Sequence, residues 1–222
     1  MISYLLLEYA PYGDLAEFIL SKFFPDDEVL VRTIFHQILN GVEYLHSVGV
    51  AHLDLKPENI LLSKGYSLKI TDFDSSVHTR NASNVGTVGT RNYRAPEIRH
   101  SRCKDPRKAD IYSLGIILFL LKSGTFPYSE IKNVEEGQKY KYMIENGDEA
   151  FWESHPSSRE NGEQFSPEFR SLFMSMVNHD TEARATIKEI KGTEWFKGKT
   201  YSQEELKHRM RQIISVSNRF SN

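Results

Sequence analysis

The chain has 222 residues, 39% of them hydrophobic and 26% charged, a composition close to the globular average that excludes intrinsic disorder and fibrous folds. Its 28 Lys and Arg residues against 30 Asp and Glu residues give a net charge of −2, which argues against a general binder of nucleic acid or anionic membranes. The single cysteine, Cys103, cannot form an internal disulfide or a thiolate zinc site, so we expect a reducing compartment, the cytoplasm with the nucleus as an alternative.

The N-terminal part predicts a strand followed by two helices. Residues 2–9 form an apolar run that ends before a proline and a glycine, which predicts a strand. Asp14, with a glutamate three residues later, has the spacing of a capping box and predicts a short helix to about residue 24. A longer helix is predicted from residue 26 to Gly49, because its apolar residues recur at steps of three and four. These residues are Leu30, Ile34, Ile38, Val42 and Leu45.

The periodicity changes in the middle of the chain. Two short apolar segments, 60–62 and 68–70, flank Gly65 and predict a small hairpin. Residues 72–107 carry Gly, Asn, Ser, Arg and Pro without any period, which predicts a long loop. Long loops of this kind usually have a function.

The second half predicts several helices. The segment from Lys108 to Leu121 is apolar on all sides and predicts a buried helix with Gly124 as its C-cap; it is too short to cross a bilayer. A further helix is expected at 134–145. Later helix starts are marked by Ser166-Pro167, by Thr186 with Glu189, and by Ser202 with Glu205. The sequence therefore predicts a mainly helical domain with a small β element that holds the loops.

Chemically useful side chains are concentrated in residues 52–59 (HLDLKPEN) and 71–74 (TDFD). Asp54 could accept a proton and Lys56 could hold a phosphate oxygen. Asn59 and Asp72 offer the hard oxygen ligands that suit Mg²⁺. Any one of these residues alone would more often be a turn former or a helix cap, but their combination in this order favours a functional site.

These residues resemble motifs of the protein kinase family. HLDLKPEN is similar to the family's catalytic loop, and TDF is similar to the start of its magnesium-binding motif. Residues 89–97 (GTRNYRAPE) resemble the end of the activation segment, and residues 110–115 (DIYSLG) resemble the start of the central buried helix. The resemblance extends from residue 4 to about residue 197, where Trp195-Phe196 is similar to the closing helices.

The resemblance implies a fold and a domain organisation. Residues 1–198 would form a kinase domain made of the hinge and the C-terminal lobe, and residues 199–222 would form a helical tail outside it. The fold would be mainly α, a helical bundle with a small β hairpin, a long activation loop and a hinge strand at the N-terminus. The 222 residues contain no counterpart of the family's glycine-rich loop or strand lysine, so we expect the N-terminal lobe to be absent.

The resemblance also implies roles in catalysis and nucleotide binding. Asp54 would be the catalytic base that orients the substrate hydroxyl, Lys56 would contact the γ-phosphate of ATP, and Asn59 would complete the catalytic set. Asn59 and Asp72 would hold Mg²⁺. The positions against ATP would be Leu7, Glu8, Ala10, Asp14, Glu58, Leu61 and Asp72. For Asp14, a helix-capping role stands beside the ligand role as an equal alternative.

Five other residues match structural positions of the family. Asp110 would hold the backbone of the catalytic loop, and His52 would pack behind that loop. The hydroxyl of Thr90 would bond to the catalytic Asp and Lys. Glu97 and Arg184 would form an ion pair that ties the activation segment to the helical core.

Three features depart from the family's usual pattern or suggest another site. Leu53 replaces an arginine that in many members pairs with a phosphorylated activation loop, and Asp74 stands where the family has glycine. The basic residues of 91–108 could suggest an anion site, but acidic residues interrupt them, and we interpret them as a solvated loop face.

Two functions follow from the sequence. The favoured one is an ATP- and Mg²⁺-dependent serine/threonine protein kinase, a signalling enzyme, because Lys56-Pro57-Glu58 resembles the serine/threonine form of the loop. Its partners would be ATP and a protein with a Ser or Thr acceptor, without nucleic acid or membrane. The alternative is a truncated or pseudokinase lobe that acts as a protein-interaction module. The substrate, the oligomeric state and the activity of the 222-residue chain itself are left open.

Overall fold

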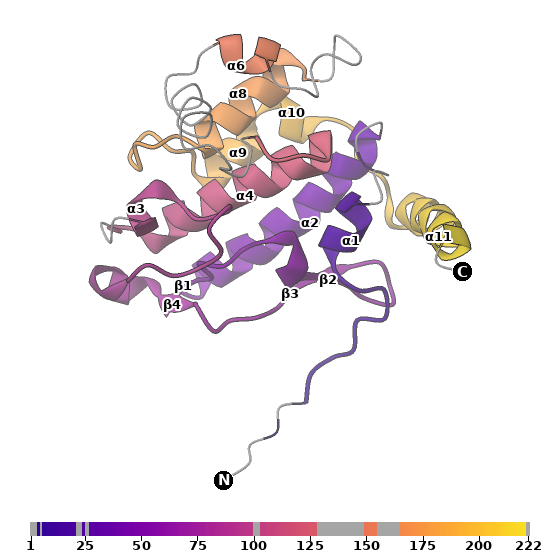
Figure 1. Ribbon diagram of the computed structural model, residues 1–222, viewed down its shortest axis with the longest axis horizontal. Helices are drawn as coiled ribbons and strands as arrows, with labels where there is room; N and C mark the ends of the chain where they lie inside the picture. Colours follow the sequence, from indigo (N-terminus) through magenta and orange to yellow (C-terminus); the bar gives the residue numbers. More distant parts are fainter. Residues whose placement is uncertain are drawn as a thin grey trace.

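The computed structural model describes residues 4, 6–20, 24, 27–99, 103–127, 149–154 and 165–220 (Figure 1). Helices make up most of the regular structure in these residues, which confirms the mainly α class. Within the same ranges, no helix is long and apolar enough to cross a membrane. The helix expected at 134–145 lies outside the described residues.

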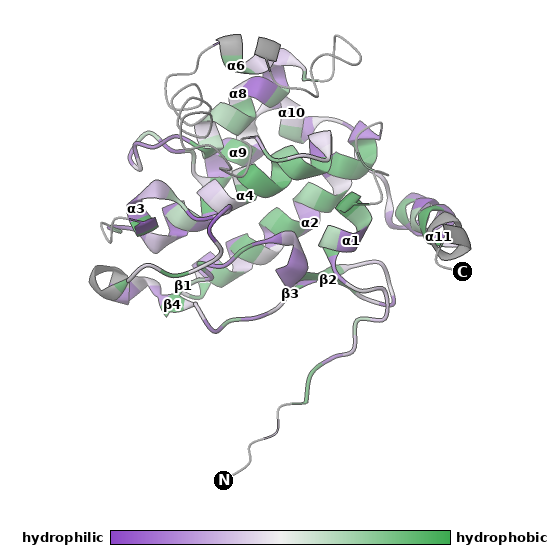
Figure 2. Ribbon diagram, viewed as in Figure 1, coloured by the Kyte–Doolittle hydropathy of each residue, from purple (hydrophilic) through white to green (hydrophobic). Residues whose placement is uncertain are grey.

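Two long helices form the centre of the molecule. Helix α2 (Glu28–Ser47) begins at Asp27, whose carboxylate accepts a hydrogen bond from the backbone N–H of Leu30 at 2.9 Å. Four of the five residues of its predicted apolar face are buried and Leu45 is half-buried, and the helix packs beside α4 (Pro106–Ser123). Figure 2 shows the hydrophobic colour that runs along both helices. The centre of the core therefore lies where the 3.6-residue periodicity places it.

Helix α4 confirms the predicted buried helix but begins two residues earlier than expected. The side chain of Asp105 caps the backbone N–H of Arg107, and Pro106 occupies the first turn, where a missing N–H costs nothing. At the other end, Gly124 adopts φ +71° and donates its N–H to the carbonyl of Leu120 at 2.8 Å. Glycine fits this left-handed cap because it has no Cβ.

Shorter helices surround this pair. They are α1 (Leu15–Leu20), α3 (Pro96–Arg99), α6 (Glu149–Ser154), α8 (Pro167–Met176), α9 (Ile187–Gly192) and α10 (Glu194–Lys197). The predicted starts of α8 and α9 are confirmed by side-chain caps at Ser166 and Thr186. Helix α1 is described over Leu15–Leu20; residues 21–23 lie outside the described residues, and residue 24, its expected end, is not helical.

The β structure is small and only partly as predicted. Strands β2 (Ile60–Leu62) and β3 (Leu68–Ile70) pair antiparallel, which confirms the hairpin. Strands β1 (Val50–Ala51) and β4 (Val77–His78) also pair antiparallel, although the sequence did not predict them. A two-residue strand is too short to show a period of two, and its partner lies far along the chain.

Two sequence expectations are wrong. The strand expected at 2–9 is not present in its described residues, where Leu6 is 99% exposed and the backbone extends away from the helices (Figure 1). A strand needs a partner for its N–H and C=O groups, and none lies beside this segment in the described chain. The loop expected at 72–107 instead contains β4, the 3₁₀ helix η2 (Thr79–Asn84) and α3. These elements are too short to produce a periodic pattern.

The tail forms helix α11 (Gln203–Phe220), which begins at the predicted capping pair. The N–H of Ser202 donates to Glu205 Oε2 at 2.7 Å, and the N–H of Glu205 donates to Ser202 Oγ at 3.3 Å. An apolar stripe of α11 is buried against the core, formed by Leu206, Met210 and Ile213. The helix therefore belongs to the folded unit although it lies at one side of it (Figure 1).

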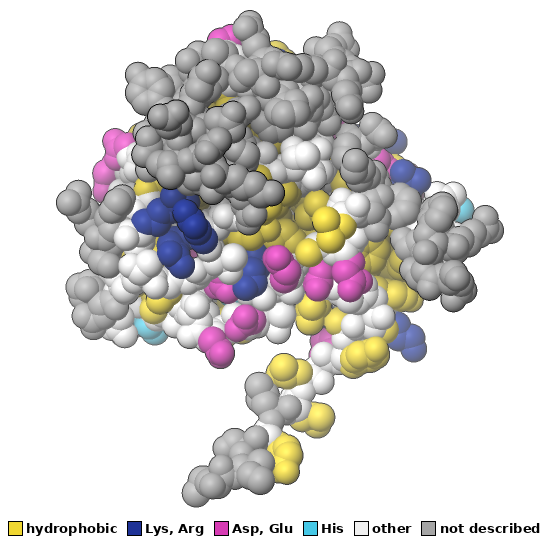
Figure 3. Space-filling model, in the orientation of Figure 1, with side chains coloured by type: hydrophobic (Ala, Val, Ile, Leu, Met, Phe, Trp, Pro, Cys, Tyr) yellow, Lys and Arg dark blue, Asp and Glu magenta, His cyan; other side chains and the backbone are white. Residues whose placement is uncertain are grey.

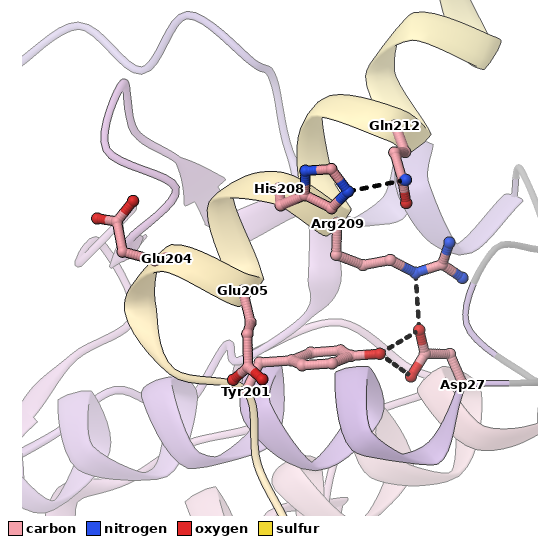
Figure 4. A pocket seen from close by; sticks show the side chains of 7 residues that line it. All are labelled: Asp27, Tyr201, Glu204, Glu205, His208, Arg209 and Gln212. Carbon is pink, nitrogen blue, oxygen red and sulfur yellow. Dashed lines mark hydrogen bonds and ion pairs between the residues drawn. The ribbon is translucent and has the colours of Figure 1, made fainter.

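Polar contacts at the start of α2 also attach the tail (Figure 4). The Tyr201 hydroxyl donates to the carboxylate of Asp27 at 3.1 Å, and Arg209 Nε donates to Asp27 Oδ2 at 2.7 Å. These residues line an open pocket of about 680 Å³ together with Glu204, Glu205, His208 and Gln212. Asp27 thus caps α2 and holds α11 at the same time.

Candidate active site

The backbone that precedes Asp54 is held by Asp110 at the start of α4. The Asp110 side chain is fully buried. Its Oδ1 accepts from the N–H of Leu53 at 2.8 Å, and its Oδ2 accepts from the N–H of His52 at 2.9 Å and from His46 Nε2 at 2.8 Å. A buried carboxylate is costly unless it is hydrogen-bonded, and here three donors satisfy it. Asp110 therefore holds the backbone at His52 and Leu53, directly before Asp54.

Leu53 connects these contacts to Asp54 through an unusual backbone conformation. Its φ is +64°, a region that residues with a Cβ rarely adopt. Such a conformation costs of order 1–3 kcal/mol and persists only where surrounding contacts hold it. Here the N–H of Leu53 is bound by Asp110 and the side chain is buried. Leu53, which stands where many family members have an arginine, thus contributes a buried apolar side chain to the core.

His52 links the catalytic loop to the segment that carries Asp72. Its Nδ1 accepts from the N–H of Asp54 at 3.2 Å, and its Nε2 lies 3.0 Å from the carbonyl of Thr71. One neutral tautomer, with the proton on Nε2, satisfies both contacts. His52 is fully buried, so its ring positions two loops rather than binding a ligand at the surface.

Asp54, Lys56 and Thr90 form one hydrogen-bonded group. The N–H of Thr90 donates to Asp54 Oδ1 at 2.6 Å, and Lys56 Nζ donates to Asp54 Oδ2 at 3.0 Å and to Thr90 Oγ1 at 2.9 Å. The turn can approach this closely because Gly89 has φ +80° and no side chain; a Cβ there would lie 2.2 Å from the carbonyl oxygen of Leu53. The fold thereby brings the activation segment onto the predicted base.

The charge of Asp54 is stabilised by these neighbours. Burial alone would raise the pKa of its carboxyl, but hydrogen bonds from Thr90 and Lys56 and the positive charge of Lys56 outweigh it and lower the pKa below its ordinary value. The Asp54 side chain is 12% exposed and that of Lys56 is 20% exposed, so both remain accessible at the surface. Asp54 is therefore an ionised proton acceptor at neutral pH.

The predicted magnesium ligands lie at one end of the β2–β3 hairpin. The carbonyl of Asn59 accepts from the N–H of Thr71 at 3.0 Å, which continues the ladder beyond the Ile60–Ile70 pair and brings Asp72 beside Asn59. Asn59 Nδ2 donates to the carbonyl of Asp54 at 3.0 Å, which leaves the amide oxygen for a cation. Asp72 is exposed and has φ +63°.

This donor set fits Mg²⁺. An amide oxygen and a carboxylate are hard ligands, and Mg²⁺ is commonly held by one or two protein groups together with phosphate oxygens and water. No cluster of three or more His, Cys, Asp or Glu side chains exists in the part of the chain that the structure describes. Asp74 lies in an exposed turn and does not have a positive φ, so the aspartate is not strained at the position where the family has glycine.

The positions expected against ATP are only partly brought together. Asp14 forms a bridge with Leu61, and the N–H of Leu62 donates to the carbonyl of Gly13 at 2.9 Å. Asp14 Oδ1 also accepts from the N–H of the glutamate that follows it by three residues, which is the capping role. Asp14 and Leu61 are therefore adjacent, whichever role Asp14 has.

The remaining nucleotide positions lie farther along the extended segment or at the surface. Leu7 is 66% exposed, and no described contact joins it to the Asp54 loop. Glu8 forms an exposed ion pair with Lys69 at 3.2 Å, and Ala10 is half-buried. Glu58 is exposed. The pKa of the Tyr93 hydroxyl is raised mainly because Tyr93 is buried and, to a smaller extent, by the negative charge of Glu58. The structure thus groups Asp54, Lys56, Asn59 and Asp72 but not Leu7 or Glu8.

Glu97 and Arg184 form a buried bidentate pair. Their nitrogen–oxygen distances are 2.6 and 2.9 Å, and Arg184 is 1% exposed. The guanidinium also donates to the carbonyls of Asn178 and Lys108 at 2.8 and 2.7 Å. One side chain thereby joins α3, the start of α4 and the segment before α9.

The site also contains a contact that no motif indicated. Ser113 Oγ, on α4, donates to the carbonyl of Tyr93 at 2.8 Å. It adds a second connection between α4 and the activation segment. A single serine in an apolar helix carries no sequence signal that would identify its partner.

Comparison with known proteins agrees with this geometry. The model of the protein kinase domain matches residues 2–196. CBL-interacting protein kinase 26 from Oryza sativa subsp. japonica is 35% identical over 198 residues, which cover 87% of this chain and 37% of the relative. CBL-interacting serine/threonine-protein kinase 10 from Arabidopsis thaliana is 34% identical over 225 residues, 96% of this chain and 42% of the relative.

The chain belongs to the protein kinase family, whose members generally use ATP and Mg²⁺. It spans about two fifths of the length of the curated relatives described here.

Proposed function

We propose that this chain is part of a serine/threonine protein kinase that transfers the γ-phosphoryl group of ATP to Ser or Thr hydroxyls of proteins. The observation that carries the proposal is the group formed by Asp54, Lys56 and Thr90, in which an ionised carboxylate and an ammonium lie 3.0 Å apart at the surface. Residues 1–198 would correspond to the hinge and the C-terminal lobe of the kinase domain, and residues 199–222 to a helical tail.

The arrangement suits phosphoryl transfer chemically. The Asp54 carboxylate would accept a hydrogen bond from the substrate hydroxyl and take its proton as the new oxygen–phosphorus bond forms and the bond to the ADP oxygen breaks. Asp54 Oδ1 already accepts one hydrogen bond and Oδ2 accepts two, from Lys56 and from Asn59 Nδ2 at 3.4 Å, but together the two oxygens offer about four acceptor sites. Lys56 would donate to the transferring group and offset its negative charge.

Asn59 and Asp72 would hold Mg²⁺, which when bound neutralises charge on the phosphates. The backbone contacts of Asp110 and the ring of His52 would hold Asp54 and Asp72 in fixed positions relative to each other during the reaction. Asp14 and Leu61, which lie side by side, would form the nucleoside end of the site.

The acceptor specificity follows from the same loop. Lys56 donates to the Thr90 hydroxyl, and the sequence Lys56-Pro57-Glu58 resembles the serine/threonine form of the family's loop. One of the relatives is named a serine/threonine-protein kinase. We therefore infer aliphatic hydroxyl acceptors rather than tyrosine.

The test compares Asp54→Asn with the parent in the protein as its gene encodes it. Transfer of labelled phosphate from Mg-ATP to a mixed protein substrate should fall by roughly 100- to 10,000-fold, the usual contribution of a general base. Asp105→Asn is the matched control, since asparagine also caps a helix and the described side-chain contacts of Asp105 are with Arg107 and not with Asp54. Acid hydrolysis of the product should yield phosphoserine or phosphothreonine. Equal turnover by Asp54→Asn and the parent would contradict the assignment.

A further inference from the structure

Two tyrosine rings stack beside the nucleoside end of the proposed site. The ring centroids of Tyr12 and Tyr66 are 5.1 Å apart, and their planes differ by 8°. A hydrogen bond between the two side chains is the main cause that raises the pKa of Tyr12 above its ordinary value. Tyr66 is buried and Tyr12 is half-buried. An aromatic pair of this kind stabilises the two segments that carry its rings relative to each other.

Tyr12 is the residue at which the extended N-terminal segment joins the folded body. Tyr9 is still 82% exposed, and Figure 3 shows hydrophobic side chains along this segment, apart from the body. Tyr12 packs against the core instead. Its N–H donates to the carbonyl of Leu62 at 3.4 Å, and the carbonyl of Gly13 accepts from the N–H of Leu62 at 2.9 Å. The Tyr12 ring therefore holds the backbone directly before Asp14.

Tyr66 lies in the turn between β2, which carries Leu61, and β3. Its φ is +61°, a conformation that residues with a Cβ rarely adopt and that persists only where surrounding contacts hold it. Here the N–H of Tyr66 donates to the carbonyl of Ser63 at 2.9 Å, and the ring stacks on Tyr12. The stack thus joins the segment that carries Leu61 to the one that carries Asp14.

Helix α11 contacts the same turn from the other end of the sequence. Gln203 Nε2 donates to the carbonyl of Gly65, the residue before Tyr66, at 3.0 Å. The positive charge of Arg211, about two helical turns farther along, acts on Tyr12 and partly offsets the rise in its pKa. Tyr66 and the apolar stripe of α11 belong to one buried cluster. Figure 1 shows α11 at the side of the molecule where the loop after β2 also lies.

We propose that Tyr12 and Tyr66 are positioning residues that couple α11 to nucleotide binding. Docked α11 holds the hairpin turn and the stack, and the stack holds Asp14 beside Leu61. The proposal rests on the proposed function, which places the nucleoside at Asp14 and Leu61. Because the two rings act through these residues and not on the reacting atoms, the coupling changes the affinity for nucleotide and not the rate of phosphoryl transfer.

The first experiment measures the Kd for Mg-ADP and the kinetic constants for ATP in the protein as its gene encodes it. Tyr12→Ala should raise the Kd and the KM for ATP by roughly three- to tenfold, the contribution of one aromatic pair, and should leave kcat nearly unchanged. Tyr12→Phe keeps the ring and should retain most of the affinity. An unchanged Kd in Tyr12→Ala, or a loss that appears only in kcat, would overturn the proposal.

The second experiment tests the contribution of α11. Met210→Asp places a charge in the buried stripe and should weaken nucleotide binding to a similar extent. His208→Ala is the control, since His208 is exposed and its described contact is with Gln212 of the same helix. If α11 acts through the stack, the double variant with Tyr12→Ala should bind nucleotide about as well as the weaker single variant, because effects on one linkage do not add. Fully additive losses would overturn the coupling.

Amide hydrogen exchange of the nucleotide-free protein separates this proposal from the proposed function. The amide of Leu62, which donates to Gly13, should exchange faster in Tyr12→Ala and in Met210→Asp, while α8 keeps its protection and shows that the domain is folded. If even the parent binds no nucleotide but Leu62 exchanges faster in both variants, the proposed function fails and the link between α11 and residues 12–14 stands. If Leu62 is protected equally in the parent and both variants, the coupling fails whatever the activity.

Discussion

Two regions of the molecule hold a carboxylate against a cation, in opposite surroundings. In the region around α4, Asp110 is fully buried, and Arg184 binds Glu97 with almost no exposed surface. In the tail, Arg209 binds Asp27 with the side chains 37% and 11% exposed. The geometry is similar, since both ion pairs are shorter than 3 Å. What differs is whether water can replace a lost partner.

The comparison shows how two parts of one domain are held together. Around α4, polar contacts join segments that are 57, 58 and 87 residues apart, and the acceptors of these contacts, Asp110 and Glu97, are buried. The tail is held instead by the buried apolar stripe of α11, with Tyr201 and Arg209 at its edge. We therefore expect substitutions in the first region to affect the whole domain and polar substitutions in the second to have small effects.

The largest effect is expected for Arg184→Ala. Removing one partner of a buried ion pair leaves an uncompensated charge, here Glu97, at a cost of about 3–5 kcal/mol in the free energy of unfolding. Denaturant unfolding of the variant and the parent measures the difference. A loss below about 1 kcal/mol would show that Glu97 gains access to water and would remove the contrast with the tail.

Asp110→Asn should have an intermediate effect. The substitution leaves one oxygen acceptor for three donors, so a backbone N–H of His52 or Leu53 becomes unsatisfied at a cost of about 1–3 kcal/mol. Amide hydrogen exchange gives the local readout, and exchange at His52 and Leu53 should become faster while α8 keeps its protection. Unchanged protection at both amides would show that Asp110 does not hold the loop.

Arg209→Ala should have a small effect. An ion pair with an exposed partner usually contributes about 0–1 kcal/mol, because water and salt replace the lost interaction. Helix α11 should stay attached through its apolar stripe, as judged by limited proteolysis of the tail. Met210→Ala is the matched comparison, since it removes buried surface from the same helix and should release the tail more readily. If Arg209→Ala released the tail more readily than Met210→Ala, the tail would depend on its polar contacts, as the region around α4 does.

The smallest effect concerns the ionisation of Asp54. Its pKa is lowered in the folded protein, so its contribution to stability is present above the ordinary Asp pKa of about 3.9 and is lost as the pH falls through the lower folded value. A ¹³C NMR titration of the carboxyl carbon should therefore give a midpoint below about 3.9. Lys56→Met should move the midpoint upward, because it removes both a hydrogen bond and a positive charge. An unchanged midpoint in this variant would show that Lys56 does not stabilise the Asp54 charge.

Local interactions explain what could be predicted from the sequence. The caps of α2, α8, α9 and α11 depend on residues only three positions apart, and the apolar faces repeat every three or four residues. The hairpin is similarly local, and the family motifs that predict Asp54, Lys56, Asn59 and Asp72 as site residues lie in two short stretches, 52–59 and 71–74. These features depend on residues that are close together in the chain, so they can be predicted from the sequence.

Tertiary structure alone decided the rest. The pairing of β1 with β4 and the contact of Ser113 with Tyr93 depend on neighbours that are distant in the chain. Glu97 is a clear case, because it lies among the basic residues of 91–108 in the sequence but pairs with Arg184, which is 87 residues away. Charge order along a chain does not determine which charges meet, since an ion pair requires an approach to within about 4 Å and only the packed structure sets that distance.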